Sequence, residues 1–351
     1  MTPTGFPDDV DVTIVAHNSW TTLPDTLRSL VGAACPPDRI TVVDVASSDE
    51  TRARLAAEWP AVHVIELSRN DGPNPGRNLA FLRSRRRFVL LMDPDVQVIP
   101  ETVGRLHAGM LADPTVKVGS PIVVHLTRPD TIQYAGGALH YLCEAVNPWH
   151  DRPLAERGVT PAPIGAAPAC ALLIEREAAL HAGLFDERYF LGKDDGDFIH
   201  RMRIAGHTVL EIPDAIVLHR SRPRGTGLFY YQIRNRWHFI LKNYEWRTIV
   251  SLLPALVIHE PLQFGVLCLK GHGLTYLRAV IGLLAMLPAL PADRAVVAGM
   301  RRRPDRDLLV TGALLVREDL AGGRLAQAGK ALYESWLAAY WSFVTRTLLA
   351  S

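Results

Sequence analysis

The sequence lacks the two phosphate-binding loops most common in nucleotide-binding α/β proteins. No Gly-x-Gly-x-x-Gly motif follows the first apolar segment, where His17-Asn18-Ser19-Trp20 stands instead. No Gly-x-x-x-x-Gly-Lys-Ser/Thr motif occurs in the 351 residues. These absences argue against a dinucleotide-binding fold and against a P-loop protein. A phosphate-bearing ligand would therefore need another neutralising device, such as a metal ion.

Cysteine is scarce and the charge is balanced. The four cysteines lie far apart with no Cys-x-x-Cys pair, so they predict neither a zinc site nor a disulfide framework and suit a reducing compartment. Lys plus Arg is 38 and Asp plus Glu is 36, which argues against nucleic acid as a partner. Residues 1–9 show no basic segment followed by an apolar one, so we expect a cytoplasmic protein without a secretory signal.

Long uninterrupted apolar runs are also missing. The stretch Ala279–Ala292 is uncharged over only 14 residues, whereas a bilayer span needs ~20. We expect Pro254, Glu260 and Pro261 to interrupt the stretch Ile249–Leu269. The aromatic, basic helices of the C-terminal region then suit three arrangements: packing on the rest of the chain, a homodimer, or peripheral contact with the cytoplasmic face of a membrane.

Strands and helices alternate in the first third of the chain. Apolar segments typical of buried strands are separated by segments with helical spacing, and the strand-like segments are 10–16, 40–45, 62–67 and 88–92. This alternation predicts an α/β fold with a mostly parallel, Rossmann-like sheet flanked by helices.

The rest of the chain differs in composition. Residues 121–168 are rich in Pro and Gly and are expected to form hairpins and loops over one edge of the sheet. A further change near residue 225 predicts an α/β domain over 1–224 and a helical extension over 225–351.

Asp93-Pro94-Asp95 directly follows the apolar run Phe88–Met92. The carboxyl ends of parallel strands are where open α/β sheets bind ligands. Two carboxylates one residue apart can both face a hard divalent cation. Asp and Pro are also ordinary turn formers, so the motif alone leaves a simple turn open.

Three other polar residues stand at predicted strand or helix ends. Asp44 ends the second strand and could accept from a base N–H or a ribose hydroxyl, or cap the next helix. Arg77 begins a helix, where it could bind an anion or remain a solvated surface residue. His219 ends an apolar strand ahead of three arginines, which favours an anionic or metal-bearing site over a structural histidine.

Asp194-Asp195-Gly196-Asp197 places three carboxylates at a helix start. Acids in the first turn stabilise the helix dipole, which one residue would achieve. Three acids repel one another, and a carboxylate whose proton affinity is raised in this way makes a useful general base.

In chain order, these segments resemble the family-2 glycosyltransferases with a GT-A fold, over about Val12 to Arg236. The matching segments are His17-Asn18, Val42 through Thr51, Asn70 through Asn78, Asp93-Pro94-Asp95, Gly183 through Phe190 with Asp194 through Asp197, and Pro213 through His219. Six motifs in the expected order are more specific than any one of them. The Asp93 motif, Gly136-Gly137 and Arg234-Asn235 also resemble rhamnosyltransferases of cell-wall or polysaccharide assembly.

The resemblance implies an inverting, metal-dependent transfer of a sugar from a nucleoside diphosphate sugar to an acceptor hydroxyl. It implies donor binding by His17, Asn18, Asp44, Arg77 and Asp93, binding of Mn²⁺ or Mg²⁺ by Asp95, Asp93 and His219, and a place beside the acceptor or phosphate for Asp197, Arg222 and Arg224. Asp195 would deprotonate the acceptor. Because Asp194 replaces the family's usual Glu, either acid could be the base.

Several alternatives stay open at this point. The acceptor could be lipid-linked or a soluble small molecule, and a protein that binds nucleotide sugars without catalysis would share the same pattern. A sugar nucleotidyltransferase has a similar sheet, but it would need a Gly-rich, Arg-containing loop after the first strand, which residues 17–20 do not supply.

Overall fold

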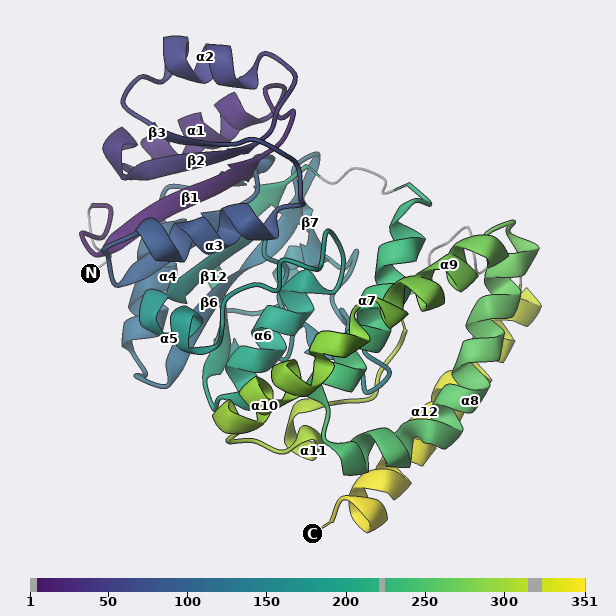
Figure 1. Ribbon diagram of the computed structural model, residues 1–351. Helices are drawn as coiled ribbons and strands as arrows, with labels where there is room; N and C mark the ends of the chain where they lie inside the picture. Colours follow the sequence, from purple (N-terminus) through teal and green to yellow (C-terminus); the bar gives the residue numbers. More distant parts are fainter. Residues whose placement is uncertain (1–4, 221–224, 315–323, 351) are drawn as a thin grey trace.

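A mixed ten-stranded sheet organises the N-terminal part of the chain (Figure 1). The computed structural model describes residues 5–220, 225–314 and 324–350. The strands are β1 (Val10–Ala16), β2 (Ile40–Val45), β3 (His63–Leu67), β4 (Phe88–Met92), β5 (Val96–Val98), β6 (Val116–His125), β7 (Arg128–Tyr134), β10 (Ala162–Pro163), β11 (Ala171–Glu175) and β12 (Thr208–His219). A separate pair is formed by β8 (Ala138–Leu139) and β9 (Ala145–Val146).

The sheet order is β10-β12-β6-β11-β4-β1-β2-β3. Six of these strands run in one direction, because β3, β2, β1 and β4 pair in parallel, β6 and β12 pair in parallel, and β11 is antiparallel to both β4 and β6. The prediction of a mostly parallel α/β sheet is therefore confirmed. The reversed strand β11 brings its amino end to the carboxyl end of β4.

Helices cover both faces of the sheet, as apolar residues at helical spacing predict. On one face, α1 (Leu23–Gly32), α2 (Thr51–Glu58) and α4 (Thr102–Leu111) pack on the core around Ile14 and Leu90. On the other, α3 (Asn74–Arg83), α5 (Arg176–His181) and α6 (Asp194–Ile204) pack around Leu91 and Leu172.

The prediction of loops over residues 121–168 is wrong at its start. Pro121 lies inside β6, a ten-residue strand between β11 and β12. Proline lacks the backbone N–H that a central strand uses. The structure accommodates it at a register shift, where β12 skips from Ile212 to Ile216 opposite Pro121 and Ile122. The later hairpin and short strands agree with the prediction.

The C-terminal region is helical, as predicted. Its helices are α7 (Leu228–Asn243), α8 (Trp246–Leu269), α9 (Gly273–Leu284), α10 (Leu290–Met300), α11 (Asp305–Leu308) and α12 (Arg324–Phe343). Figure 1 shows α8 and α12 side by side at the far edge of the molecule, and residues such as Leu252, Leu256 and Trp341 form a shared core. The proposed boundary between 224 and 225 falls at the edge of the described residues and stays a prediction.

The expected interruption of α8 is wrong. The helix continues for 24 residues through Pro254 and Pro261, each of which removes only one backbone donor. Trp246–Leu269 and Gly273–Met300, the latter including a 3₁₀ turn between α9 and α10, are both long and apolar enough to cross a membrane. The conclusion from sequence that these segments are too short to span a bilayer therefore does not hold on length.

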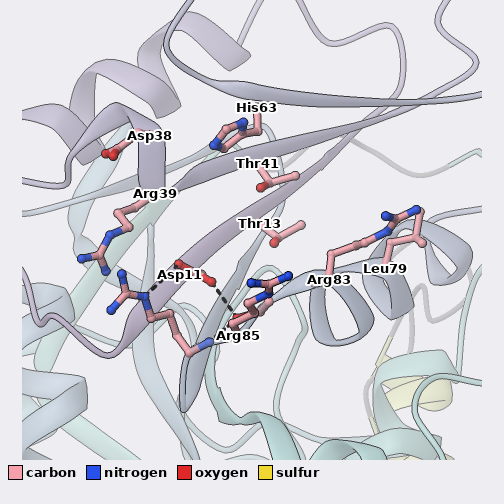
Figure 2. Close-up of a pocket in the computed structure, with 12 residues that line it drawn as sticks. Asp11, Thr13, Asp38, Arg39, Thr41, His63, Leu79, Arg83 and Arg85 are labelled. Atoms are coloured by element: carbon pink, nitrogen blue, oxygen red, sulfur yellow. Dashed lines mark hydrogen bonds and ion pairs between the residues drawn. The ribbon is translucent and has the colours of Figure 1, made fainter.

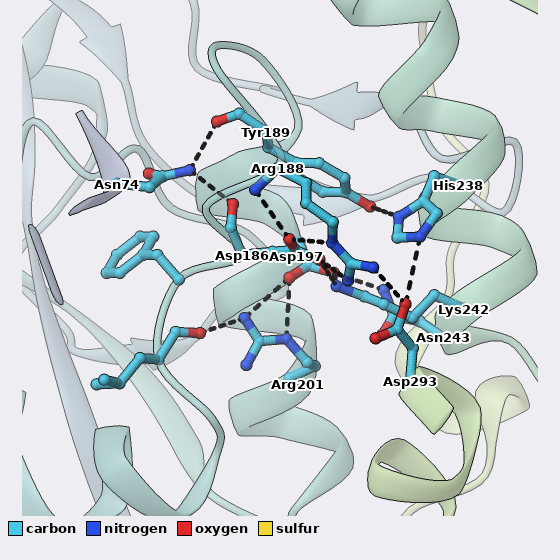
Figure 3. Close-up of polar contacts among 12 residues, drawn as sticks. Asn74, Asp186, Arg188, Tyr189, Asp197, Arg201, His238, Lys242, Asn243 and Asp293 are labelled. Atoms are coloured by element: carbon cyan, nitrogen blue, oxygen red, sulfur yellow. Dashed lines mark hydrogen bonds and ion pairs between the residues drawn. The ribbon is translucent and has the colours of Figure 1, made fainter. Parts of the chain in front are cut away.

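A buried ionic network fixes α6 to α7 (Figure 3). Lys242 Nζ lies 2.8 Å from Asp186 Oδ2 and 2.7 Å from Asp197 Oδ1, while Arg201 pairs with the second oxygen of Asp197. Burial opposes ionisation of Asp186, but the hydrogen bonds and charges of Arg188 and Lys242 outweigh it and lower its pKa. The network thus joins the segment before α6 to the C-terminal helices.

Replacing Lys242 with Met should destabilise the protein strongly. Asp186 and Asp197 would keep buried charges without their shared cation, at a cost of about 3–5 kcal/mol in the free energy of unfolding. Lys330→Met is the matched control, because Lys330 and Glu334 form a partly exposed pair on one helix and should contribute less than ~1 kcal/mol. Equal losses for the two variants in denaturant titrations would contradict this assignment.

Candidate functional site

The site lies at one edge of the sheet, where the carboxyl ends of the parallel strands meet. Asp93 follows β4, His219 ends β12, and β12 runs parallel to β6 and hence to β4. Asp93 N donates to the carbonyl of Cys170, which precedes the reversed strand β11. The topology therefore brings residues that lie more than 120 positions apart in the sequence to one edge, which is where open α/β sheets bind ligands.

Arg77 is the centre of this site. Its side chain from α3 is 5% exposed, and Nη1 lies 2.7 Å from Asp194 Oδ2 and 3.8 Å from Asp195 Oδ1. Nη2 lies 3.4 Å from Asp93 Oδ1. The side chain of Asn74 accepts from Arg77 and donates to the carbonyls of Asp186 and Tyr189. One guanidinium thus holds three carboxylates from two parts of the chain.

The predicted contact between Arg77 and a nucleoside disagrees with this arrangement. Both terminal nitrogens already pair with carboxylates, and the residue is almost fully buried. A buried arginine is stabilised by such paired acids, and here the paired acids are Asp93, Asp194 and Asp195.

Asp194 and Asp195 differ sharply in accessibility. The Asp194 side chain is 3% exposed and pairs with Arg77, whereas that of Asp195 is 33% exposed and Oδ2 accepts from the backbone N–H of Ala169. Burial, the adjacent Asp195 charge and a hydrogen bond between the two carboxyls raise the pKa of Asp194 to about 7, against the charge of Arg77. Of the two acids, Asp195 is the one a substrate hydroxyl can reach.

Asp95 and His219 form the part of the site that suits a cation. His219 Nε2 lies 3.4 Å from Asp95 Oδ1, and His219 Nδ1 lies 2.9 Å from Gln133 Oε1. Because the amide oxygen can only accept, Nδ1 carries the proton, and in the neutral imidazole Nε2 then presents a lone pair towards the carboxylate. Two acceptors facing each other at this separation fit a cation between them, since ligands of one Mg²⁺ lie about 3 Å apart.

The protein alone does not form a complete metal cage. Among the described residues, no three His, Cys, Asp or Glu side chains are placed to hold one ion. Mg²⁺ and similar ions commonly take one or two protein ligands together with substrate phosphates and water. Asp95 and His219, with Asp93 nearby, therefore fit a cation that is shared with a bound diphosphate.

The carboxyl ends of β1 and β2 form the neighbouring part of the edge. Asp44 is fully buried; Oδ2 pairs with Arg52 and accepts from the Ser47 N–H, while Oδ1 has no hydrogen-bond partner among the described residues. This unused acceptor fits a ligand N–H or hydroxyl. The Ser47 contact closes a turn in the loop after β2. Asp44 does not cap α2 as considered from sequence, because the N-cap of that helix is Glu50 and no side chain caps it.

His17 and Asn18 connect β1 to the loop after β2. His17 Nδ1 lies 2.7 Å from the carbonyl of Val45. Asn18, at φ 49°, accepts from the backbone N–H groups of Ser48 and Asp49. Both side chains are exposed, and their predicted contacts with a donor stay predictions.

The assignment of Asp197 to the acceptor side is wrong. Asp197 is fully buried, and both of its oxygens are occupied by Lys242, Asn243 and Arg201 (Figure 3). No oxygen remains for a substrate. Arg222 and Arg224 lie outside the described residues, so the structure does not place them.

Sequence reasoning missed two contributors to the site, Gln133 from β7 and Arg52 from α2. The Ala169 N–H, from the loop before β11, also faces the site. Gln133 and Arg52 carry no local signal, because their contacts depend on packing between distant segments.

A cavity of about 500 Å³ lies at the opposite edge of the sheet (Figure 2). Asp11, Thr13, Thr41 and Arg39 line it from the amino ends of β1 and β2, and Arg83 lines it from the end of α3. Strand β1 has seven residues, so this cavity is about 20 Å from the acidic site. It is not part of that site.

Comparisons with known proteins agree with this geometry. Residues 11–167 match the model of glycosyl transferase family 2. The chain is 26% identical over 239 residues to N-acetylglucosaminyl-diphospho-decaprenol L-rhamnosyltransferase of Mycobacterium tuberculosis, covering 61% of this chain and 76% of that protein. It is 33% identical over 99 residues to succinoglycan biosynthesis protein ExoO of Rhizobium meliloti, covering 28% of each.

A solved structure shares the fold. The crystal structure of GalNAc-T7 with UDP, GalNAc and Mn²⁺ superimposes with a TM-score of 0.57 at 19% identity, covering 70% of this chain and 49% of that one. The chain therefore spans about half the length of that protein, and the likeness concerns the fold. The chain therefore contains a glycosyl transferase family 2 domain over residues 11–167 and has a GT-A fold, with Asp93, Asp95, Asp195 and His219 gathered at one edge of its sheet.

Proposed function

We propose that the protein transfers a sugar from a nucleoside diphosphate sugar to an acceptor hydroxyl with inversion at the anomeric carbon. The observation that carries the proposal is the accessible carboxylate of Asp195, held 3.8 Å from Arg77 Nη1, beside Asp93 and the Asp95–His219 pair. A base and a cation-binding pair at one ligand-binding edge are what such a transfer uses.

The donor would lie along the edge from β2 to β4. Its base or ribose would use the unpaired Oδ1 of Asp44, close to the exposed His17 and Asn18. Its diphosphate would face Asp95 and His219, and Asp93 would contact the ribose or sugar. A divalent cation held there, Mn²⁺ or Mg²⁺, would neutralise the charge that develops on the leaving diphosphate.

Asp195 would act as the general base. The acceptor oxygen attacks the anomeric carbon as the bond from that carbon to the diphosphate oxygen breaks on the opposite face. The acceptor proton moves to Asp195, and the nucleoside diphosphate leaves with the electron pair. Asp195 stays oriented because the Ala169 N–H donates to one of its oxygens at 3.2 Å and Arg77 faces the other.

The acceptor is proposed to be a lipid-linked sugar in cell-wall or polysaccharide synthesis, with a deoxyhexose such as rhamnose as the transferred group. The support is similarity to the mycobacterial rhamnosyltransferase, whose name specifies a diphospho-decaprenol acceptor. A panel of UDP-, GDP- and dTDP-sugars, assayed for release of the nucleoside diphosphate with and without Mn²⁺ and a polyprenyl-diphosphate sugar, tests donor, metal and acceptor separately. No turnover with any donor, despite donor binding, would instead favour a non-catalytic binding protein.

Asp195→Asn should lower kcat by about 10²–10⁴-fold while leaving donor affinity nearly unchanged, because it removes the proton acceptor but keeps the shape. The measurements are initial rates and calorimetric binding of the donor that works best. Asp214→Asn, at an exposed Asp that pairs weakly with Arg105, is the matched control. A variant at Asp195 that retains most of its activity would refute the base assignment.

The activity should rise with pH through about 7. Below that pH, Asp194 is protonated, and its hydrogen bond to Asp195 lowers the basicity of Asp195. Above it, Asp194 loses this proton and adds a negative charge, so Asp195 becomes a stronger base. Profiles of kcat/KM from pH 5.5 to 8.5 should show this step in the native protein and lack it in Asp194→Asn, whose amide never ionises. If both proteins show the same rise in kcat/KM, the titrating group is not Asp194.

Gln133→Leu should weaken Mn²⁺ binding by about 10–100-fold, because His219 loses the acceptor that fixes its tautomer. Gln133→Glu keeps an acceptor at this position and should retain affinity close to that of the native protein. Free Mn²⁺ is measured by electron paramagnetic resonance in the presence of the nucleoside diphosphate that most raises Tm. Equal binding by both variants and the native protein would show that His219 does not hold the ion.

A further inference from the structure

Helix α8 presents an apolar face that nothing in the described structure covers. Trp246, Val250, Leu253 and Val257 are exposed at spacings of three and four residues, which places them along one side of the helix. The exposed Cys268 lies on the same side three turns further along, whereas Leu262, Val266 and Leu269 are exposed on the other side of the second half of the helix. The helix is about 36 Å long for its 24 residues. The opposite side, including Leu252 and Leu256, packs against α12.

The next two helices also expose apolar residues. Leu274, Leu277, Ile281 and Leu284 of α9 are exposed, and Val296 of α10 is as well. The buried side of α9, including Tyr276 and Ala279, packs with α7. In the most apolar 18-residue part of α8 only 28% is buried, and in that of Gly273–Met300 only 17% is buried. The core helix of a soluble domain would be mostly buried. We call these exposed residues of α8, α9 and α10 the apolar face.

The charges around the apolar face have one sign. Between Trp246 and Met300 the exposed charged residues are Arg247, Lys270 and Arg278, all basic. The two acids in this range are partly buried and paired: Glu260 with Arg236, and Asp293 with Arg188. Arg247 and Lys270 stand at the two ends of α8, so the basic groups border the apolar residues.

We propose that the apolar face inserts into one leaflet of an anionic bilayer and holds the protein on the membrane surface. A bilayer accepts a long apolar face without matched contours, and its anionic headgroups attract the basic border. Because the other side of α8 is packed on α12, the helix lies in the interface and does not span the membrane. This inference rests on the exposed residues and their charges, independently of the proposed sugar transfer.

The chain contains a natural reporter for this contact. Cys268 is exposed near the end of α8, whereas Cys35, Cys143 and Cys170 are buried. The full-length native protein, labelled at Cys268 with a polarity-sensitive thiol dye, should show a blue-shifted emission when vesicles of phosphatidylcholine with 30% phosphatidylglycerol are added. It should also sediment with these vesicles, and do so less with pure phosphatidylcholine or in high salt.

Val257→Glu should lower binding to these vesicles by about tenfold or more, because a charge would enter the leaflet in place of an apolar group. Val159→Glu is the matched control, since Val159 is 75% exposed and Val257 69%, and it lies on a loop far from α8 in the sequence. The control should bind as the native protein does, and unchanged circular dichroism and Tm would show that both variants fold.

Two results would overturn the proposal. One is vesicle binding by Val257→Glu equal to that of the native protein. The other is absence of vesicle binding together with a dimer in light scattering that Val257→Glu converts to a monomer, which would show that a second copy covers the apolar face. Activity on a soluble acceptor is measured alongside, so that failure of membrane binding is distinguished from failure of the proposed transfer.

Discussion

The buried guanidinium of Arg77 is the interaction on which the site depends. Four aspartates at this edge would repel one another strongly, and a cation among three of them allows the fold to gather them. Its position is set by the close approach of α3 to the sheet, because a Cβ at Gly76 would lie 2.9 Å from Val15 Cγ1. A larger residue there would push the helix, and the guanidinium with it, away from the acids.

A second set of contacts holds the segment that precedes the two central acids. Lys193, at φ 65°, begins α6 and reaches Glu144 with its ammonium group. Asp186 and Tyr189 in the preceding loop pair with Lys242 and His238 of α7. The C-terminal helices therefore do more than cover the α/β part. They fix the loop that leads into Asp194 and Asp195, which ties the geometry of the proposed base to a region outside the matched domain.

The sequence allowed the sheet and the placement of Asp93, Asp95 and His219 at one edge to be predicted, because strand periodicity and polar residues at strand ends are local signals. The features that were predicted wrongly depend on packing between segments that lie far apart in the sequence. Asp197 belongs to the same motif as Asp195, but it lies two residues further along α6, about half a helical turn, and so points into the core. Proline propensity also predicted the wrong structure in two places. In β6 a register shift accommodates the proline, and in α8 each proline costs the helix only one backbone donor.

The charge at the site gives an independent reason to expect a cation. With Asp93, Asp95, Asp194 and Asp195 ionised and Arg77 the one described cation among them, the site would carry −4 + 1 = −3 charges and would repel a diphosphate. The raised pKa of Asp194 removes part of this charge by retaining a proton. A divalent ion on Asp95 and His219 would remove most of the rest and attract phosphate oxygens. Ion and donor then stabilise each other's binding, because each supplies the charge that the other lacks.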